Sequence, residues 1–238
     1  SDLWGPSRVP SLGGGLYMLT FIDDYSRKVW VYILKHKHEA FAQFKQWKAM
    51  VEKQTGKQLK RLRTDNGLEF CNSAFNEFCK NEGIVRHRTV RNTPQHNGVA
   101  ERMNRTILEK TRCILSNAGL PRKFWAETVN TACYLINRSP STAIECKTPV
   151  EVWSGAPADY TNLRIFGCPA YAHVNDGKLE PRARKCIFLG YADGVKGYRL
   201  WCLDEKSPRC IISRDVTFDE SAMLKPKGCH DAGKVEDK

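Results

Sequence analysis

Two acidic residues, Asp65 and Glu101, lie where a carboxylate could take part in chemistry. Asp65 ends the strand-like run QLKRLR-T and opens the turn sequence Asp65-Asn66-Gly67. Glu101 follows a polar loop and falls in the first turn of a predicted helix, where the helix dipole favours negative charge. Converging carboxylates repel each other unless a cation neutralises them, and magnesium suits such a site because it keeps positions for water and phosphates.

Helical geometry places Glu101 on the outer face of its helix. At 100° per residue, Glu101, Arg105 and Arg112 fall within about 60° of one another. Met103 and Ile107 form an apolar stripe on roughly the opposite side, which we expect to be buried. On the residues alone, Glu101 could equally be a solvated acid supported by Arg105 at position i+4.

The first half of the chain predicts an α/β arrangement that can position these acids. The spacing of apolar residues and the turn sequences predict a hairpin, helices and short strands in alternation. One central mixed sheet with flanking helices follows from this order. The predicted elements are a hairpin over 16–34, a helix over 39–55, the strand QLKRLR, a helix ending at Gly83, a strand over 84–90, and helices over 98–118 and 123–137.

The composition changes after a linker-like stretch at residues 154–162. Beyond it come the strand-like runs CPAYAHV, KCIFLGYA, GYRLWCL and CIISRDVTF, separated by turn sequences. Evenly spaced short strands with turn chemistry between them predict a small antiparallel barrel. Residues 221–238 are expected to form a tail.

The composition limits the classes of partner and compartment. The 238 residues carry a formal net charge of +12, which fits either a polyanionic partner such as nucleic acid or a merely basic soluble protein. The ten cysteines are scattered, without zinc-ligand spacing. No signal peptide or membrane-length apolar run is present, so we expect reduced thiols and a cytosolic or nuclear protein.

Several motifs together resemble one known family. TDNGLEF and PQHNGVAERMNR are similar to the second and third acidic motifs of retroviral and retrotransposon integrases, and 35 residues lie between the two acids, as in that family. DLWGP resembles the first acidic motif of copia-type retrotransposon integrases. FIDDYSRKVWVYIL, FWAETVNTACYLINRSP and the barrel sequences also resemble that type. The resemblance covers the chain up to about Glu220.

The resemblance implies a fold and a reaction. It implies a ribonuclease-H-like catalytic core over residues 1–157, a small all-β barrel over 163–220 and a tail over 221–238. Asp2, Asp65 and Glu101 would be the catalytic residues and would bind two magnesium or manganese ions for phosphoryl transfer. The implied activity is that of a DNA integrase, a polynucleotidyl transferase encoded within a Pol polyprotein.

The same resemblance implies DNA partners. Element-end DNA and target DNA would be bound by a homo-oligomer, a dimer or tetramer, in the nucleus after a cytoplasmic particle stage, with no membrane association or secretion. In the helix after the loop, Arg105 and Arg112 are expected to bind phosphates, and Asn104 to contact DNA or support the site. In the barrel, Lys178, Arg182, Arg184 and Lys185 form either a DNA-contacting patch or ordinary surface charge.

Other polar residues favour structural roles. Asp23 and Asp24 are expected to be turn residues of the hairpin rather than metal ligands. His87 in a strand and His96 in the loop are not expected to be catalytic. The polar segment from Asn92 to Asn97 is expected to become ordered when DNA binds.

The sequence departs from the family pattern at its start. The family's zinc-binding segment is not present, and only Ser1 precedes Asp2. We therefore expect a truncated first strand, with this chain poorly stable and inactive until upstream residues are restored. The alternative function is a catalytically decayed or truncated nucleic-acid-binding remnant of such an integrase. A bacterial-type transposase is disfavoured by the barrel sequence.

Overall fold

The structure is a computed structural model of the chain, and it falls into two compact units. It describes residues 1–65, 67, 70–88, 98–174, 182–192, 194–203 and 209–223. The first unit comprises Ser1–Thr111 and Ala132–Tyr160, and the second comprises Arg112–Thr131 and Thr161–Lys238. Each unit is described by itself below.

The strands of the first unit form two hydrogen-bonded groups. An antiparallel sheet has the order β1 (Asp2–Trp4), β2 (Tyr17–Ile22) and β3 (Val29–Leu34), and a parallel pair joins β4 (Arg61–Thr64) to β5 (Val85–Arg88). The prediction of one continuous sheet is therefore wrong in detail. Among the described strands, the three-residue β1 pairs with β2 alone. A hydrogen bond from the Ser1 nitrogen to the Arg63 carbonyl, at 2.8 Å, links the two groups of strands.

The hairpin between β2 and β3 confirms the turn role of Asp23. Its Oδ2 accepts hydrogen bonds from the Ser26 nitrogen at 2.8 Å and the Ser26 hydroxyl at 2.7 Å. Arg27 takes a positive φ of 61°, and Ile22 then pairs with Val29 across the hairpin. The side chain of Asp23 thus closes the turn by bonding its own backbone two to three residues on.

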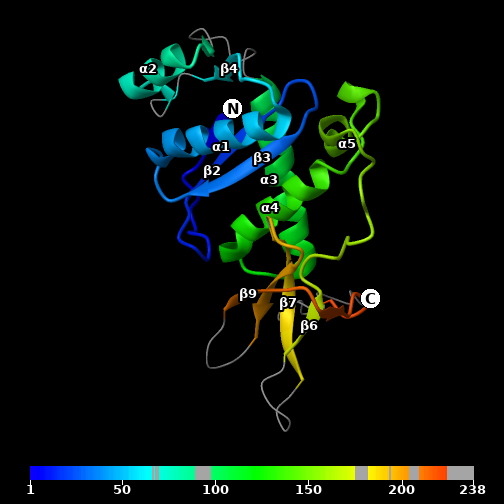
Figure 1. The fold of residues 1–238 in the computed structure, drawn as a ribbon. Coiled ribbons are helices and arrows are strands. Elements are labelled where there is room, and N and C mark those ends of the chain that lie inside the picture. The colour runs from blue at the N-terminus through cyan, green and yellow to red at the C-terminus, as the bar shows by residue number, and fades with distance from the viewer. Residues whose placement is uncertain are drawn as a thin grey trace, which may run out of the picture. The chain divides into compact units, whose positions relative to one another are not determined.

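Helix α1 (Glu39–Thr55) covers one face of the β2–β3 sheet (Figure 1). Phe21 of β2 stacks on Trp47 of α1 with ring centroids 4.3 Å apart. Phe44 stacks in turn on Phe75 of α2 (Ser73–Asn81) at 4.9 Å, so one aromatic cluster joins the sheet to both helices. Gly56 ends α1 with a φ of 66°, a conformation that glycine adopts without steric cost.

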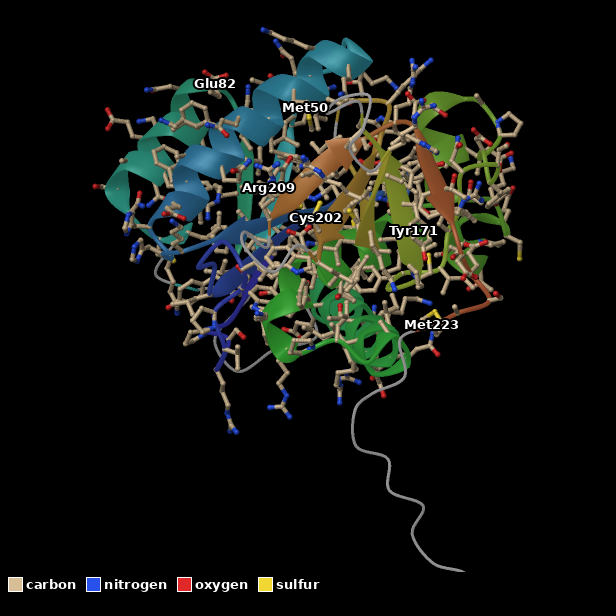
Figure 2. All side chains as sticks on the ribbon, turned by 90° about the horizontal axis from the view of Figure 1, so that it is seen from below. Met50, Glu82, Tyr171, Cys202, Arg209 and Met223 are labelled. Atoms are coloured by element: carbon tan, nitrogen blue, oxygen red, sulfur yellow. The ribbon has the colours of Figure 1, made fainter. Side chains whose placement is uncertain are left out.

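An ion-pair network links α1 to the end of α2. The ammonium group of Lys48 lies 2.7 Å from Glu52 on the same helix and 2.8 Å from Glu82, which is labelled in Figure 2. Glu52 also accepts a hydrogen bond from the Leu59 nitrogen at 2.7 Å, just before β4. These bonds hold in place the segment that leads into β4, the strand after which Asp65 follows.

The opposite face of the same sheet is covered as well. Met18 and Thr20 point away from Phe21 along β2 and are fully buried. Asn137, just after α4 (Trp125–Ile136), exchanges two 2.8 Å hydrogen bonds with the backbone of Val29. The sheet is therefore buried between helices, as the α/β prediction requires. Among the described residues, the other helices are α3 (Gly98–Ala118), α5 (Pro149–Ser154) and the 3-10 turns η3 (Arg122–Phe124) and η4 (Thr142–Ile144).

The second unit contains a five-stranded antiparallel sheet with the order β10-β6-β7-β8-β9. The strands are β6 (Pro169–His173), β7 (Ala183–Tyr191), β8 (Tyr198–Cys202), β9 (Cys210–Ser213) and β10 (Val216–Phe218). The two edge strands, β9 and β10, are joined by residues 214 and 215 alone, so their ends lie within about 11 Å of each other. The sheet must curl back on itself to allow this, which confirms the predicted small barrel.

The helical segments of the second unit pack on the outside of this sheet. Arg199 of β8 forms two hydrogen bonds with the carboxylate of Glu127, at 3.0 and 2.9 Å. Gly190 has a φ of 127°, and a side chain there would meet the hydroxyl of Thr131 at 2.5 Å. The bare backbone lets Thr131 donate to the Leu189 carbonyl at 3.2 Å. No described helix of either unit is long and apolar enough to cross a membrane.

Candidate metal and DNA site

Asp2 is held in the first unit by strand pairing and by its own hydrogen bonds. It pairs with Thr20 across the β1–β2 ladder, and its carbonyl accepts from the Thr20 hydroxyl at 3.2 Å. One carboxylate oxygen accepts from the Leu3 nitrogen at 2.9 Å, and the other accepts from the amide of Asn104 at 2.8 Å. The carboxylate is half-buried and points toward helix α3.

Asp65 follows directly on the last residue of β4. Its carboxylate accepts a hydrogen bond from the Gly67 nitrogen at 3.1 Å, which shapes the turn that the sequence predicts. The bond between the Ser1 nitrogen and the Arg63 carbonyl brings the start of β1 beside the end of this strand. Two acids that are 63 positions apart in sequence therefore lie close together.

The pKa of the Asp2 carboxyl reflects the nearby charge of Asp65. Burial raises the pKa of the Asp2 carboxyl, and the negative charge of Asp65 raises the pKa further. The hydrogen bond from Leu3, the positive charge of the Ser1 amino group and the hydrogen bond from Asn104 lower the pKa and do not cancel the rise. A buried carboxylate beside a second negative charge is a place where a cation lowers the free energy.

Asn104 is the residue that couples α3 to this acid pair. It is only 5% exposed, and its Nδ2 donates to Asp2. Its Oδ1 is buried and has no hydrogen-bond partner among the described residues. A buried acceptor without a partner costs free energy, which is compensated when water or a cation supplies the missing contact.

Glu101 is exposed in the first turn of α3 and is not grouped with the other two acids. It precedes Asn104 by three residues, which is about 4.5 Å along the axis and roughly 60° around the helix. Within the described part of the chain, no three histidine, cysteine or acidic side chains are close enough to hold a metal ion. The structure thus brings Asp2 and Asp65 together and leaves Glu101 one helical turn from the residue that contacts Asp2.

Comparison with known proteins identifies the family to which the chain is similar. Residues 1–94 match the family model described as Integrase core domain, and residues 168–231 match Retroviral polymerase SH3-like domain. The Retrovirus-related Pol polyprotein from transposon TNT 1-94 of Nicotiana tabacum is 52% identical over 226 residues, which are 94% of this chain and 17% of the polyprotein. This chain belongs to the retrotransposon integrase family.

Other relatives agree with this assignment. The Retrovirus-related Pol polyprotein from transposon RE2 of Arabidopsis thaliana is 34% identical over 223 residues, covering 92% of this chain and 15% of that polyprotein. The integrase chain therefore spans less than a fifth of the length of these relatives. A chain of the simian T-cell lymphotropic virus intasome in complex with PP2A regulatory subunit B56 gamma has a TM-score of 0.50 at 16% identity, over 95% of this chain and 79% of that one. This last likeness confirms the fold: an α/β integrase core followed by an SH3-like β domain.

The predicted DNA-binding residues of this integrase lie in different environments. Arg105 and Arg112 are exposed on α3, as the helical spacing predicts. In the barrel, Arg182 and Lys185 are exposed and Arg184 is half-buried, whereas Lys178 lies outside the described residues. Asn104 is buried, and its side-chain amide donates to Asp2.

Sequence reasoning missed how Asn104 supports the site, although a signal was present. Buried positions on α3 recur at Ala100, Asn104, Ile107 and Thr111, and a polar amide on that stripe needs a buried partner. His87 is exposed on β5, and no described metal-binding group includes it.

Proposed function

We propose that this integrase catalyses metal-dependent DNA strand transfer, which joins the 3′ ends of element cDNA to target DNA. The observation that carries the proposal is the Asp2–Asp65 pair, in which the charge of one acid raises the pKa of the other. A purely structural site would separate the two carboxylates or give each a cationic partner. Here the hydrogen-bond donors to Asp2 are the neutral groups of Leu3 and Asn104, and the positive charge of the Ser1 amino group does not cancel the rise in pKa.

The donor set fits a hard divalent cation. Carboxylate oxygens of Asp2 and Asp65, with Glu101 as the third acid, would hold magnesium or manganese, with two ions per site. Bound there, the ions would activate the attacking hydroxyl and stabilise the departing 3′-oxygen of the target strand. The partnerless Oδ1 of Asn104 is consistent with a site completed by something the protein alone does not supply.

The chain's own residues would orient the acids. The Asn104 amide holds one oxygen of Asp2, and the Leu3 nitrogen holds the other, so the carboxylate has one preferred rotamer. Because Asn104 and Glu101 share the first turns of α3, the same contact also limits where Glu101 can be. Asn104 is therefore a positioning residue, and supporting residues of this kind are typically worth 10- to 100-fold in metal affinity or activity.

DNA binding would be divided between the two parts of the chain. Residues 1–157 would form the catalytic core, with Arg105 and Arg112 on element-end phosphates, and residues 163–220 would bind DNA through Lys178, Arg182, Arg184 and Lys185. Contacts to phosphate dominate affinity and its dependence on salt. The active form would be a homo-oligomer on DNA in the nucleus, reached after a cytoplasmic particle stage.

One observation favours a second candidate function. Glu101 is not grouped with the other acids among the described residues. A nucleic-acid-binding remnant without catalysis would have this property, since phosphate binding by lysine and arginine does not require the acids. The two candidates differ in metal dependence, which can be measured directly.

The test is strand joining with magnesium or manganese, using a labelled element-end duplex and a target duplex. Strand transfer predicts that the protein with its upstream residues restored joins the two, and that Asp65→Asn and Glu101→Gln in it each abolish joining while DNA affinity changes little. Glu109→Gln, an exposed acid further along α3, is the matched control and should join normally. Joining that persists in both acid variants would refute the site, and DNA binding without any joining would favour the remnant.

A further inference from the structure

The interior of the barrel contains a pair of thiols that the integrase reaction does not use. Cys186 of β7 and Cys202 of β8 are 0% and 2% exposed, and their sulfur atoms lie 3.1 Å apart. This separation is shorter than the roughly 3.5 to 4 Å at which unbonded core atoms usually pack. Cys202 is labelled in Figure 2, on its strand in the second unit.

The two cysteines face each other directly in the sheet. The register of β7 and β8 pairs Cys186 with Cys202. The Leu203 nitrogen donates to the Lys185 carbonyl at 3.2 Å, so the adjacent pair is the hydrogen-bonded one and the cysteines occupy a non-hydrogen-bonded pair. Cα atoms at such a pair are about 4.5 Å apart, within the range that a disulfide spans without backbone movement.

We propose that Cys186 and Cys202 form an oxidisable dithiol, a modification site at which a disulfide cross-links the two central strands of the barrel. With hydrogen peroxide as oxidant, one thiolate attacks a peroxide oxygen, which gives a sulfenic acid and, after proton uptake, one water. The second sulfur attacks the sulfenic sulfur, and its proton leaves with the hydroxyl as a second water. Two thiols lose two electrons and two protons in all, and the peroxide is reduced to two waters.

The environment determines how fast this occurs. Burial, together with the neighbouring Cys202, raises the pKa of the Cys186 thiol to about 12. The Cys186 thiol is therefore protonated at neutral pH, and the pair reacts when the barrel opens locally. Cys113, Cys146 and Cys210 are exposed and should be oxidised first. The cross-link is thus a slow modification that depends on prolonged oxidation.

The test uses the 238-residue chain with Cys113, Cys146, Cys210 and Cys229 replaced by serine, so that these cysteines cannot form disulfides. After oxidation with hydrogen peroxide, mass spectrometry of the non-reduced digest should find a peptide pair linked through Cys186 and Cys202. Because the bond closes a loop between residues 16 positions apart, the melting temperature of the second unit should rise by roughly 5 to 15 °C and return on reduction.

Single variants distinguish this pair from general oxidation of the core. Cys186→Ala and Cys202→Ala should each abolish both the linked peptide and the rise in melting temperature. Cys168→Ala, another buried cysteine of the same cluster, should keep both. Two results for the folded chain with the four serine replacements would overturn the proposal: Cys186 and Cys202 remain free after oxidation, or Cys168 forms the disulfide instead. Both results are obtained without the alanine variants, so they do not depend on whether those variants fold.

Discussion

The acid site of the first unit and the polar contacts of the second unit differ in whether charged groups have partners of opposite charge. Near Asp2, a carboxylate is held close to another carboxylate, and the Asn104 Oδ1 beside it lacks a partner among the described residues. In the second unit, the described partners of Arg199 include both oxygens of Glu127, and Thr131 donates to a backbone carbonyl. The comparison teaches that the Asp2 carboxylate keeps an unfavourable charge contact, whereas the Glu127 carboxylate is matched by a cationic partner.

The largest expected effect tests whether the two units are separately stable. Phe44 in the first unit and Phe188 in the second are both fully buried among aromatic rings. Phe44→Ala and Phe188→Ala should each destabilise by about 3 to 5 kcal/mol through lost burial and cavity formation. Hydrogen exchange followed by mass spectrometry should show the loss of protection mainly in the unit that carries the substitution, and equal loss in both would mean one cooperative domain.

The next effect concerns the coupling of α3 to the acids. Asn104→Ala removes the donor to Asp2, so magnesium-dependent joining should fall by about 10- to 100-fold. Thermal stability should change little by comparison, because the variant also removes the buried acceptor that lacks a partner. Thr106→Ala, at an exposed position on the same helix, is the control. A loss of joining that only follows a loss of folding would make Asn104 structural rather than positioning.

A smaller effect is expected at the ion pair of the second unit. Glu127→Gln keeps the shape of the side chain and removes the charge that Arg199 contacts at two oxygens. Because the pair is partly buried, we expect a loss of about 1 to 2 kcal/mol in urea unfolding. Asp215→Asn, which disrupts the exposed pair with Arg214, should cost almost nothing. Equal effects at the two sites would show that burial does not strengthen the barrel pair.

The smallest effect is a pH dependence in the first unit. Burial by itself would raise the pKa of Glu52, but the Lys48 ammonium and the Leu59 nitrogen lower it below its ordinary value. A lowered pKa in the folded state stabilises the protein above the unfolded-state pKa, near 4.5, and this stabilisation is lost as the pH falls through the folded-state value. Glu52→Gln should therefore cost about 1 kcal/mol or less at pH 7, and the difference from wild type should shrink below pH 4. A difference that is constant with pH would mean that packing, rather than charge, is responsible.

Local chemistry explains which elements the sequence could predict. The helix over Glu39–Thr55 has an apolar stripe and ends at Gly56, so both its existence and its end are encoded in adjacent residues. The Asp23 turn is equally local, since its hydrogen bonds reach only Ser26. The division of the strands into two hydrogen-bonded groups could not be predicted, because the bond that joins them, from Ser1 to Arg63, links segments about 60 positions apart.

The candidate site likewise has features that local sequence predicts and features that depend on contacts between distant residues. The types and spacing of Asp65, Glu101 and the arginines of α3 were readable from the sequence, and the family resemblance added Asp2 as an expectation. The sequence alone thus determined the order of elements, the exposed face of α3 and the retrotransposon integrase family, because motifs and helical periodicity are properties of neighbouring residues. Only the tertiary structure decided that Asn104 donates to Asp2, that Asp2 and Asp65 share one electrostatic environment, and that Cys186 faces Cys202. These contacts join residues that are 16 to 102 positions apart, and their geometry is set by strand register and helix packing rather than by any local pattern.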